Sequence, residues 1–232
     1  MTRGEDAHHL TDLLARNNQL HEHAHSIGAH LAELQGWQAQ RLAEYYKDLY
    51  EKPRYRKAID FFLTDLYGGK NLSRLDHDLQ RAEPILVRLL PKSALRILTL
   101  AIELQVLSQE LDIEMTKALS SQSPITNDAY VAAYRKVDDY ARRSRQIHLA
   151  IQAGYDLDRI VQKPTIYAAM RMAHGPAHLA GFGVLQDFVE RGFMAFRHMR
   201  GAREFLDVIE TRETGLMERL FSEHPDPLGP TR

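Results

Sequence analysis

The apolar residues of this chain recur with the spacing of an α-helix along almost its whole length, and this periodicity constrains the fold more than any other feature. Between residues 37 and 50, for example, Leu42, Tyr45, Tyr46 and Leu49 follow the i, i+3, i+4, i+7 pattern. Glycines, prolines and short Ser/Asn clusters interrupt the pattern, and no stretch alternates like a β-strand. The sequence therefore predicts an all-α, single-domain bundle of about eight to ten helices.

Glycine and proline also set the expected helix ends in the second half of the chain. Thr126 is expected to open a long helix that ends at Gly154. Pro164 suits the first turn of a helix that ends near Ala173, and Pro176 is expected to open the next one, which runs to about residue 199. The last helix is expected to end near residue 221.

The two ends of the chain differ from its middle in composition. Six of the twelve histidines lie in the first thirty residues, among them His21 and His25, whose i, i+4 spacing on a helix allows chelation of a divalent cation. We interpret this start as an exposed, loosely ordered segment that binds metals only adventitiously. The expected organisation is a His-rich helical segment over 1–36, the helical bundle over 37–223 and a proline-rich, disordered tail over 224–232.

Charge and cysteine content exclude several classes of function. The 232 residues include 30 Lys+Arg and 31 Asp+Glu, so the net charge is −1 and there is no basic field for nucleic acid. The absence of cysteine excludes disulfides, thiolate nucleophiles, Fe–S clusters and cysteine-based zinc sites. The start of the chain lacks the apolar core of a signal peptide, and no apolar run is long enough to span a bilayer. We therefore expect a cytoplasmic protein with no nucleic-acid partner and no membrane span.

The segment 93–119 is apolar on two sides, which is typical of a helix at the centre of a bundle. Between the two apolar faces, Glu103, Glu110 and Glu114 form an acidic stripe. Stacked carboxylates on a central helix serve as metal ligands or proton-handling groups in some bundles, and in others they form salt bridges to a neighbouring helix. We favour a solvated seam, or salt bridges to Arg96 and to a neighbouring helix such as 142–145, and keep Glu103 and Arg145 as candidate ligand-binding residues.

Two further polar residues fall on faces that are otherwise apolar. His148 lies toward the edge of the apolar face of segment 128–153, where a histidine is more often a hydrogen-bonded core residue than a ligand. Glu213 lies in the middle of the apolar face of the last helix. Because burying an unpaired carboxylate is unfavourable, we expect it to pair with a cation. The arginines considered as partners are Arg142, Arg143, Arg145, Arg171 and Arg191.

A third polar group marks the expected junction between two helices near Pro176. Arg171, His174 and His178 cluster there, and they either line a pocket or cap the helix ends, of which we favour the second. His178 also begins an apolar stripe that we expect to be buried, and it is the fifth candidate ligand-binding residue. The stripe continues through Phe182, Leu185, Val189, Phe193 and Phe196.

Several segments together resemble a family of uncharacterised, all-helical proteins of similar length from Gram-negative bacteria. The resemblance covers residues 37–221 and implies a single all-α domain. It assigns no activity and no cofactor. The segments that carry it are Pro53-Arg54-Tyr55, Phe61-Phe62-Leu63-Thr64-Asp65-Leu66-Tyr67-Gly68, Leu89-Leu90-Pro91, Glu103-Leu104, Glu110-Leu111-Asp112, Leu185-Gln186-Asp187-Phe188, Gly192-Phe193-Met194-Ala195-Phe196, Met199-Arg200-Gly201-Ala202 and Ile209-Glu210-Thr211-Arg212-Glu213.

Two hypotheses on function follow. The first is a non-enzymatic helical protein that acts by homo-oligomerisation or by binding a protein partner, which the near-zero net charge and the abundant apolar helix faces favour. The alternative is a bundle with an internal site for a metal, haem or another small ligand, formed by residues such as Glu103, His148 and Glu213. No Gly-x-Ser-x-Gly motif occurs, and we assign no catalytic residue, cofactor or metal.

Overall fold

The computed structural model describes residues 3–66, 72–119, 124–222 and 224–229, which form eleven α-helices and one short π-helix without any strand. The all-α, single-domain prediction is confirmed, and ten of the eleven α-helices are longer than one turn. The helices are α1 (Arg3–Ser26), α2 (Gly28–Tyr45), α3 (Lys47–Tyr50), α4 (Pro53–Phe61), the π-helix η1 (Phe62–Leu66), α5 (Leu72–Leu89), α6 (Lys92–Leu119), α7 (Asn127–Val137), α8 (Tyr140–Val161), α9 (Pro164–Leu179), α10 (Gly183–Met199) and α11 (Arg203–Phe221).

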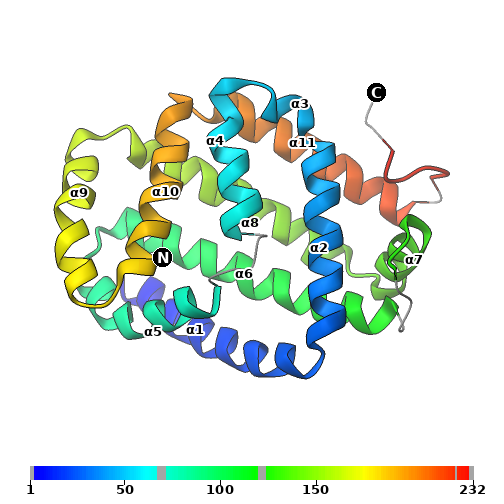
Figure 1. Ribbon diagram of the computed structural model, residues 1–232, viewed down its shortest axis with the longest axis horizontal. Helices are drawn as coiled ribbons and strands as arrows, with labels where there is room; N and C mark the ends of the chain where they lie inside the picture. Colours follow the sequence, from blue (N-terminus) through cyan, green and yellow to red (C-terminus); the bar gives the residue numbers. More distant parts are fainter. Residues whose placement is uncertain (1–2, 67–71, 120–123, 223, 230–232) are drawn as a thin grey trace.

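Helix α6 lies at the centre of the bundle, as its two apolar faces predict. It runs beside α8 across the middle of the molecule and also contacts α1, α2 and α7 (Figure 1). Leu95 and Val106 belong to an apolar cluster shared with α1, α5 and α10. Met115, nearer the end of the helix, belongs to another cluster shared with α2, α7 and α11. One helix thus supplies buried side chains to two of the three core clusters.

A third apolar cluster joins α4, α8, α10 and α11. Phe205 of α11 is at its centre, with only 1% of its surface exposed, and its ring packs against those of Tyr55 and Phe62. Helices α8 and α11 approach closely at Gly154, where an added Cβ atom would lie 2.6 Å from a methyl carbon of Leu206. The glycine therefore serves helix packing in the middle of α8.

Two predictions about the helix over 126–154 are wrong. The expected single helix is divided at Asp138, which has a left-handed backbone conformation with φ of 47°, so that α7 ends and α8 begins there. Aspartate tolerates this conformation better than most residues other than glycine. Helix α8 then continues through Gly154 to Val161, because this glycine is a packing site and not a helix end. Thr126 is the N-cap of α7, as expected, and accepts a hydrogen bond from the backbone of Ala129.

The boundary expected between Ala173 and Pro176 is also wrong. Helix α9 continues through Pro176 to Leu179, and the chain turns at Gly181, whose φ is 80°. A proline near the end of a helix removes only one backbone hydrogen bond, whereas a positive φ ends the helical geometry. Because the turn separates His178 from α10, His178 does not continue the stripe of Leu185, Phe193 and Phe196. Those three are buried, but Val189 is 44% exposed.

The His-rich start does not form the loosely ordered segment that we expected. Helix α1 packs along α6, and Leu10, Leu14 and Leu20 are buried in the cluster that it shares with α5 and α6. His21 of α1 lies 2.5 Å from the buried carboxylate of Asp76 in α5. Burial of one apolar face thus holds α1 against the bundle.

The domain boundaries remain predictions. The boundary at residue 36 falls within α2, and of the tail, residues 224–229 are described, where Leu228 packs against the cluster containing Met115. Tyr67 and Gly68 of the family-like segment lie outside the described residues, as does the side chain of His25. None of the helices that the structure describes has the length and apolarity needed to cross a membrane.

Truncation of Phe205 tests the packing of α11 against α4. Phe205→Ala is expected to lower the free energy of unfolding by about 3–5 kcal/mol, because it removes a fully buried ring and leaves a cavity. Urea denaturation followed by circular dichroism measures this change. Lys57→Ala, at an exposed position of α4, is the control and is expected to alter stability by less than about 0.5 kcal/mol. Equal effects of both substitutions would contradict the described core.

Candidate functional site

The acidic stripe of α6 faces basic residues of α8 and α1. The carboxylate of Glu103 lies 2.7 Å from the guanidinium of Arg145 and 3.6 Å from the ring of His9. Glu114 accepts a hydrogen bond of 2.5 Å from Arg142, and Glu110 lies 2.9 Å from Arg16. These contacts agree with the salt-bridge interpretation of the stripe. The pKa of Arg142 is raised above its ordinary value, chiefly by the hydrogen bond to Glu114.

The five candidate ligand-binding residues do not meet at one point through the contacts described. Only Glu103 and Arg145 contact each other. His148 is exposed on α8, and His178 lies near the end of α9, where it contacts α10. Glu213 on α11 is half-buried and accepts a hydrogen bond of 2.5 Å from the hydroxyl of Tyr46. The positions of these residues therefore do not favour a single internal site.

The partner of Glu213 differs from the one we expected. Tyr46 lies 167 residues away in the sequence and is almost fully buried. Burial raises the pKa of the Tyr46 phenol above its ordinary value, and the nearby Glu213 carboxylate adds to this effect. Arg142, Arg145 and Arg191 instead pair with other carboxylates. These three arginines therefore do not pair with Glu213, and the contact described for its carboxylate is a hydrogen bond from a neutral hydroxyl.

A polar centre that sequence reasoning missed surrounds Asp112 on α6. The amides of Gln35 and Gln38 from α2 donate hydrogen bonds of 3.3 and 3.0 Å to its two carboxylate oxygens. The buried Arg143 of α8 stands over the ring of Tyr134 at 4.5 Å and contributes positive charge to the same region. Burial raises the pKa of the Asp112 carboxyl above its ordinary value, and these neighbours oppose the increase. The sequence contains one indication of this centre, because Asp112 lies in Glu110-Leu111-Asp112, one of the segments that carry the family resemblance.

A second polar cluster joins the ends of α9 and α10. The ring Nε2 of His178 lies 2.9 Å from a carboxylate oxygen of Asp187, and Nδ1 of His174 lies 2.8 Å from Glu190. The two imidazole rings are 4.4 Å apart between centroids. The expectation that His174 and His178 cluster is confirmed, but they lie in one helix and face α10. The arrangement pairs two titratable bases with two carboxylates.

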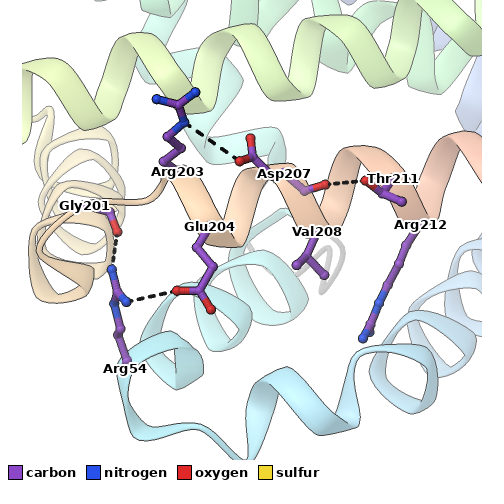
Figure 2. A pocket seen from close by; sticks show the side chains of 8 residues that line it. All are labelled: Arg54, Gly201, Arg203, Glu204, Asp207, Val208, Thr211 and Arg212. Atoms are coloured by element: carbon purple, nitrogen blue, oxygen red, sulfur yellow. Dashed lines mark hydrogen bonds and ion pairs between the residues drawn. The ribbon is translucent and has the colours of Figure 1, made fainter.

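A shallow groove of about 770 Å³ runs along the start of α11, beside Arg54 of α4 (Figure 2). Arg54 donates hydrogen bonds to the backbone oxygens of Met199 and Gly201 and lies 3.3 Å from Glu204. Arg212, at the other end, forms a two-pronged hydrogen bond with Asp48. Because protein groups already accept the hydrogen bonds of Arg54 and Arg212, these contacts favour a structural role for the two arginines over the binding of an anion in the groove.

The most unusual surface lies at the end of the molecule formed by α5, α9 and α10. No described residue of α9 is buried, and Met172 and Leu179 are 79% and 93% exposed. These two residues are two helical turns apart and therefore lie on the same side of α9. Ile85 and Leu89 are 47% and 71% exposed on α5, one turn apart. Both helices contact α10, and large exposed apolar side chains are typical of surfaces that bind proteins.

The comparison with protein families identifies the group to which the chain belongs. Residues 17–227 match the family described as Domain of unknown function (DUF8198). The chain belongs to this family. The match begins within α1, whereas the resemblance seen in the sequence began at residue 37. No curated protein and no solved structure matches the chain. The resemblance to a family of unknown function is confirmed, and a Gram-negative origin stays a prediction.

The pH dependence of stability tests the environment of Asp112. Because its pKa is raised in the folded state, Asp112 contributes most to stability below the pKa of the unfolded chain, and this contribution is lost as pH rises through the folded value. Asp112→Asn removes the ionisation. The variant is expected to gain stability relative to the natural chain, on the order of 1 kcal/mol, between pH 4 and pH 7. Urea denaturation at several pH values measures the difference.

Asp48→Asn is the matched control. The hydrogen bond from Arg212 lowers the pKa of Asp48, so its contribution is present above the unfolded pKa and is lost as pH falls. This variant is therefore expected to lose relative stability as pH rises through the acidic range below about pH 4, and to show little further change above it. The two substitutions remove the same charge, but the stability of each variant relative to the natural chain changes with pH in opposite directions, so the two plots have opposite slopes. Slopes of the same sign would contradict the environment described for Asp112.

Proposed function

We propose that this protein acts by self-association, through the apolar surface that α5, α9 and α10 present at one end of the bundle. The observation that carries the proposal is α9, a sixteen-residue helix without a buried residue that exposes Met172 and Leu179. Of the eight large hydrophobic side chains exposed among the described residues, six lie on these three helices: Ile85, Leu89, Met172, Leu179, Val189 and Met194. Exposing such side chains is unfavourable unless a partner covers them.

The charge of the chain favours a second copy of the same chain as the partner. The net charge is −1, so two copies experience little long-range repulsion. Isologous dimers are the commonest soluble oligomers, and a helix with an exposed apolar side can pack against its own symmetry mate. The same surface also suits a different helical protein. In that case the natural chain is expected to be monomeric in the experiment below.

We place the protein in the cytoplasm and regard its role as non-enzymatic. A chain without cysteine is compatible with a reducing compartment. The alternative of an internal metal, haem or small-ligand site has less support, because Glu103, His148 and Glu213 each have different surroundings.

Native mass spectrometry and sedimentation velocity of the untagged full chain test the proposal. A dimer of twice 26.7 kDa is expected at micromolar concentration. Leu179→Glu is expected to weaken dimerisation by at least about tenfold, because a charge at the centre of an apolar interface must be desolvated. Its exposed position leaves folding unchanged, which circular dichroism checks.

Tyr50→Glu is the control, because Tyr50 is an exposed large side chain on α3, outside the proposed interface. It is expected to leave the dimer intact. A monomeric natural chain at tens of micromolar would overturn self-association. A dimer that tolerates Leu179→Glu as well as Tyr50→Glu would show that the interface lies elsewhere.

A further inference from the structure

The hairpin of α9 and α10 brings four metal-binding side chains together. His174 and His178 are four residues apart in the last two turns of α9, so both project from the same side of that helix. Asp187 and Glu190 are three residues apart in the first two turns of α10 and share a side in the same way. The tight turn at Gly181, with φ of 80°, reverses the chain between them. The fold therefore places an imidazole pair opposite a carboxylate pair.

The distances in this cluster are close to those of a metal site. One ligand atom from each of His174, His178 and Asp187 lies within 4.8 Å of the others. Nε2 of His178 and a carboxylate oxygen of Asp187 are only 2.9 Å apart. Tetrahedral zinc–ligand bonds of about 2.0–2.2 Å place neighbouring ligand atoms about 3.3–3.6 Å apart, which lies between these two distances. The side chains of His174 and His178 are 46% and 40% exposed, so a small rotation can bring all three atoms onto one ion.

We propose that His174, His178 and Asp187 bind a divalent transition-metal ion of the zinc class. Imidazole nitrogens and a carboxylate are ligands that Zn²⁺ takes in proteins, and three protein ligands leave a fourth position for water or another ligand. Glu190 is not one of the three proposed metal ligands but contacts one of them. Its carboxylate lies 2.8 Å from Nδ1 of His174, which fixes the ring and leaves Nε2 for the metal, as carboxylate–histidine pairs do in zinc proteins.

The surroundings leave space at His178 and give solvent access. An added Cβ atom at Gly183 would lie 2.8 Å from Nδ1 of His178, so the glycine makes room for the ring. Gly183 also lines a hollow of about 320 Å³ together with His77 and Asp78 of α5. An ion can therefore reach the hairpin from solvent without a change in the fold.

Charged and polar groups surround the two rings. The charged groups around the rings are Asp187, Glu190 and Arg171, whose positive charge acts on Glu190. Gln186 donates a hydrogen bond of 2.9 Å to Glu190 and holds it in place beside His174.

The start of the chain offers a competing metal ligand set. Residues 21–25 have the sequence His-Glu-His-Ala-His, which matches the His-Glu-x-x-His spacing of zinc hydrolases. His21 already contacts Asp76, and the side chains of residues 22–26 lie outside the described part of the chain. A test of the hairpin must therefore separate it from this segment.

Titration of the untagged, metal-free full chain with Zn²⁺ by calorimetry, and with Co²⁺ by visible absorption, tests the proposal. The double variant His174→Gln/His178→Gln is expected to bind one ion fewer per chain and to lose the Co²⁺ bands of the hairpin site. Asp187→Asn is expected to weaken that site by at least about tenfold. The matched control His148→Gln/His198→Gln also removes two exposed histidines, and it is expected to bind as the natural chain does.

A second control variant, His21→Gln/His25→Gln, is expected to retain the ion that the hairpin variant loses. Circular dichroism confirms that each variant is folded, and the affected residues of α9 are exposed, so folding is expected to persist. Loss of all Zn²⁺ binding in the His21/His25 variant would overturn the proposal. So would equal losses in the hairpin variant and the His148/His198 control, which would indicate adventitious binding by surface histidines. Dimerisation is measured separately, so failure of one proposal does not affect the other.

Discussion

The structure depends on one helix that is apolar on two sides. α6 contacts α1, α2, α7 and α8, so the elements on either side of it are joined through its side chains. A helix in that position has only narrow strips left for polar residues, and in α6 one strip carries Glu103, Glu110 and Glu114. Negative charges stacked along a helix repel one another unless cations lie opposite. Arg142 and Arg145 of α8 and Arg16 of α1 supply those cations, and this pairing fixes how α8 and α1 lie along α6.

The sequence predicted this central part of the fold well, because apolar periodicity reports which helix faces are buried. It predicted helix ends less well, since glycine and proline each have more than one role. Gly154 permits close packing of α8 on α11, and Pro176 lies inside α9. The true breaks occur at Asp138 and Gly181, where φ is positive. The prediction applied one helical periodicity to residues on both sides of the turn at Gly181. It therefore assigned His178 to the buried stripe of α10, although this residue belongs to α9.

Periodicity also cannot identify the partner of a polar residue. It placed Glu213 on an inner face of α11, but the hydroxyl that satisfies it comes from Tyr46, at the other end of the chain. For Asp112 the same limit applies, because its two amide donors come from α2 and the nearby guanidinium from α8. Such sites form only when distant segments pack together. The His174–His178 pair was easier to predict, since both residues lie in one helix, four residues apart.

The hairpin of α9 and α10 combines an exposed apolar side with a polar cluster. Its outer helix has an exposed apolar side, and polar contacts to Asp187 and Glu190 tie it to α10. Leu179 is the residue after His178, so an ion at the two histidines and a partner on the apolar surface would act on the same helical turn. An ion that holds this turn in place reduces the entropy lost when a partner binds. Linkage then requires that the partner strengthens binding of the ion by the same factor. Metal binding and self-association would therefore be coupled through α9, in which no described residue is buried.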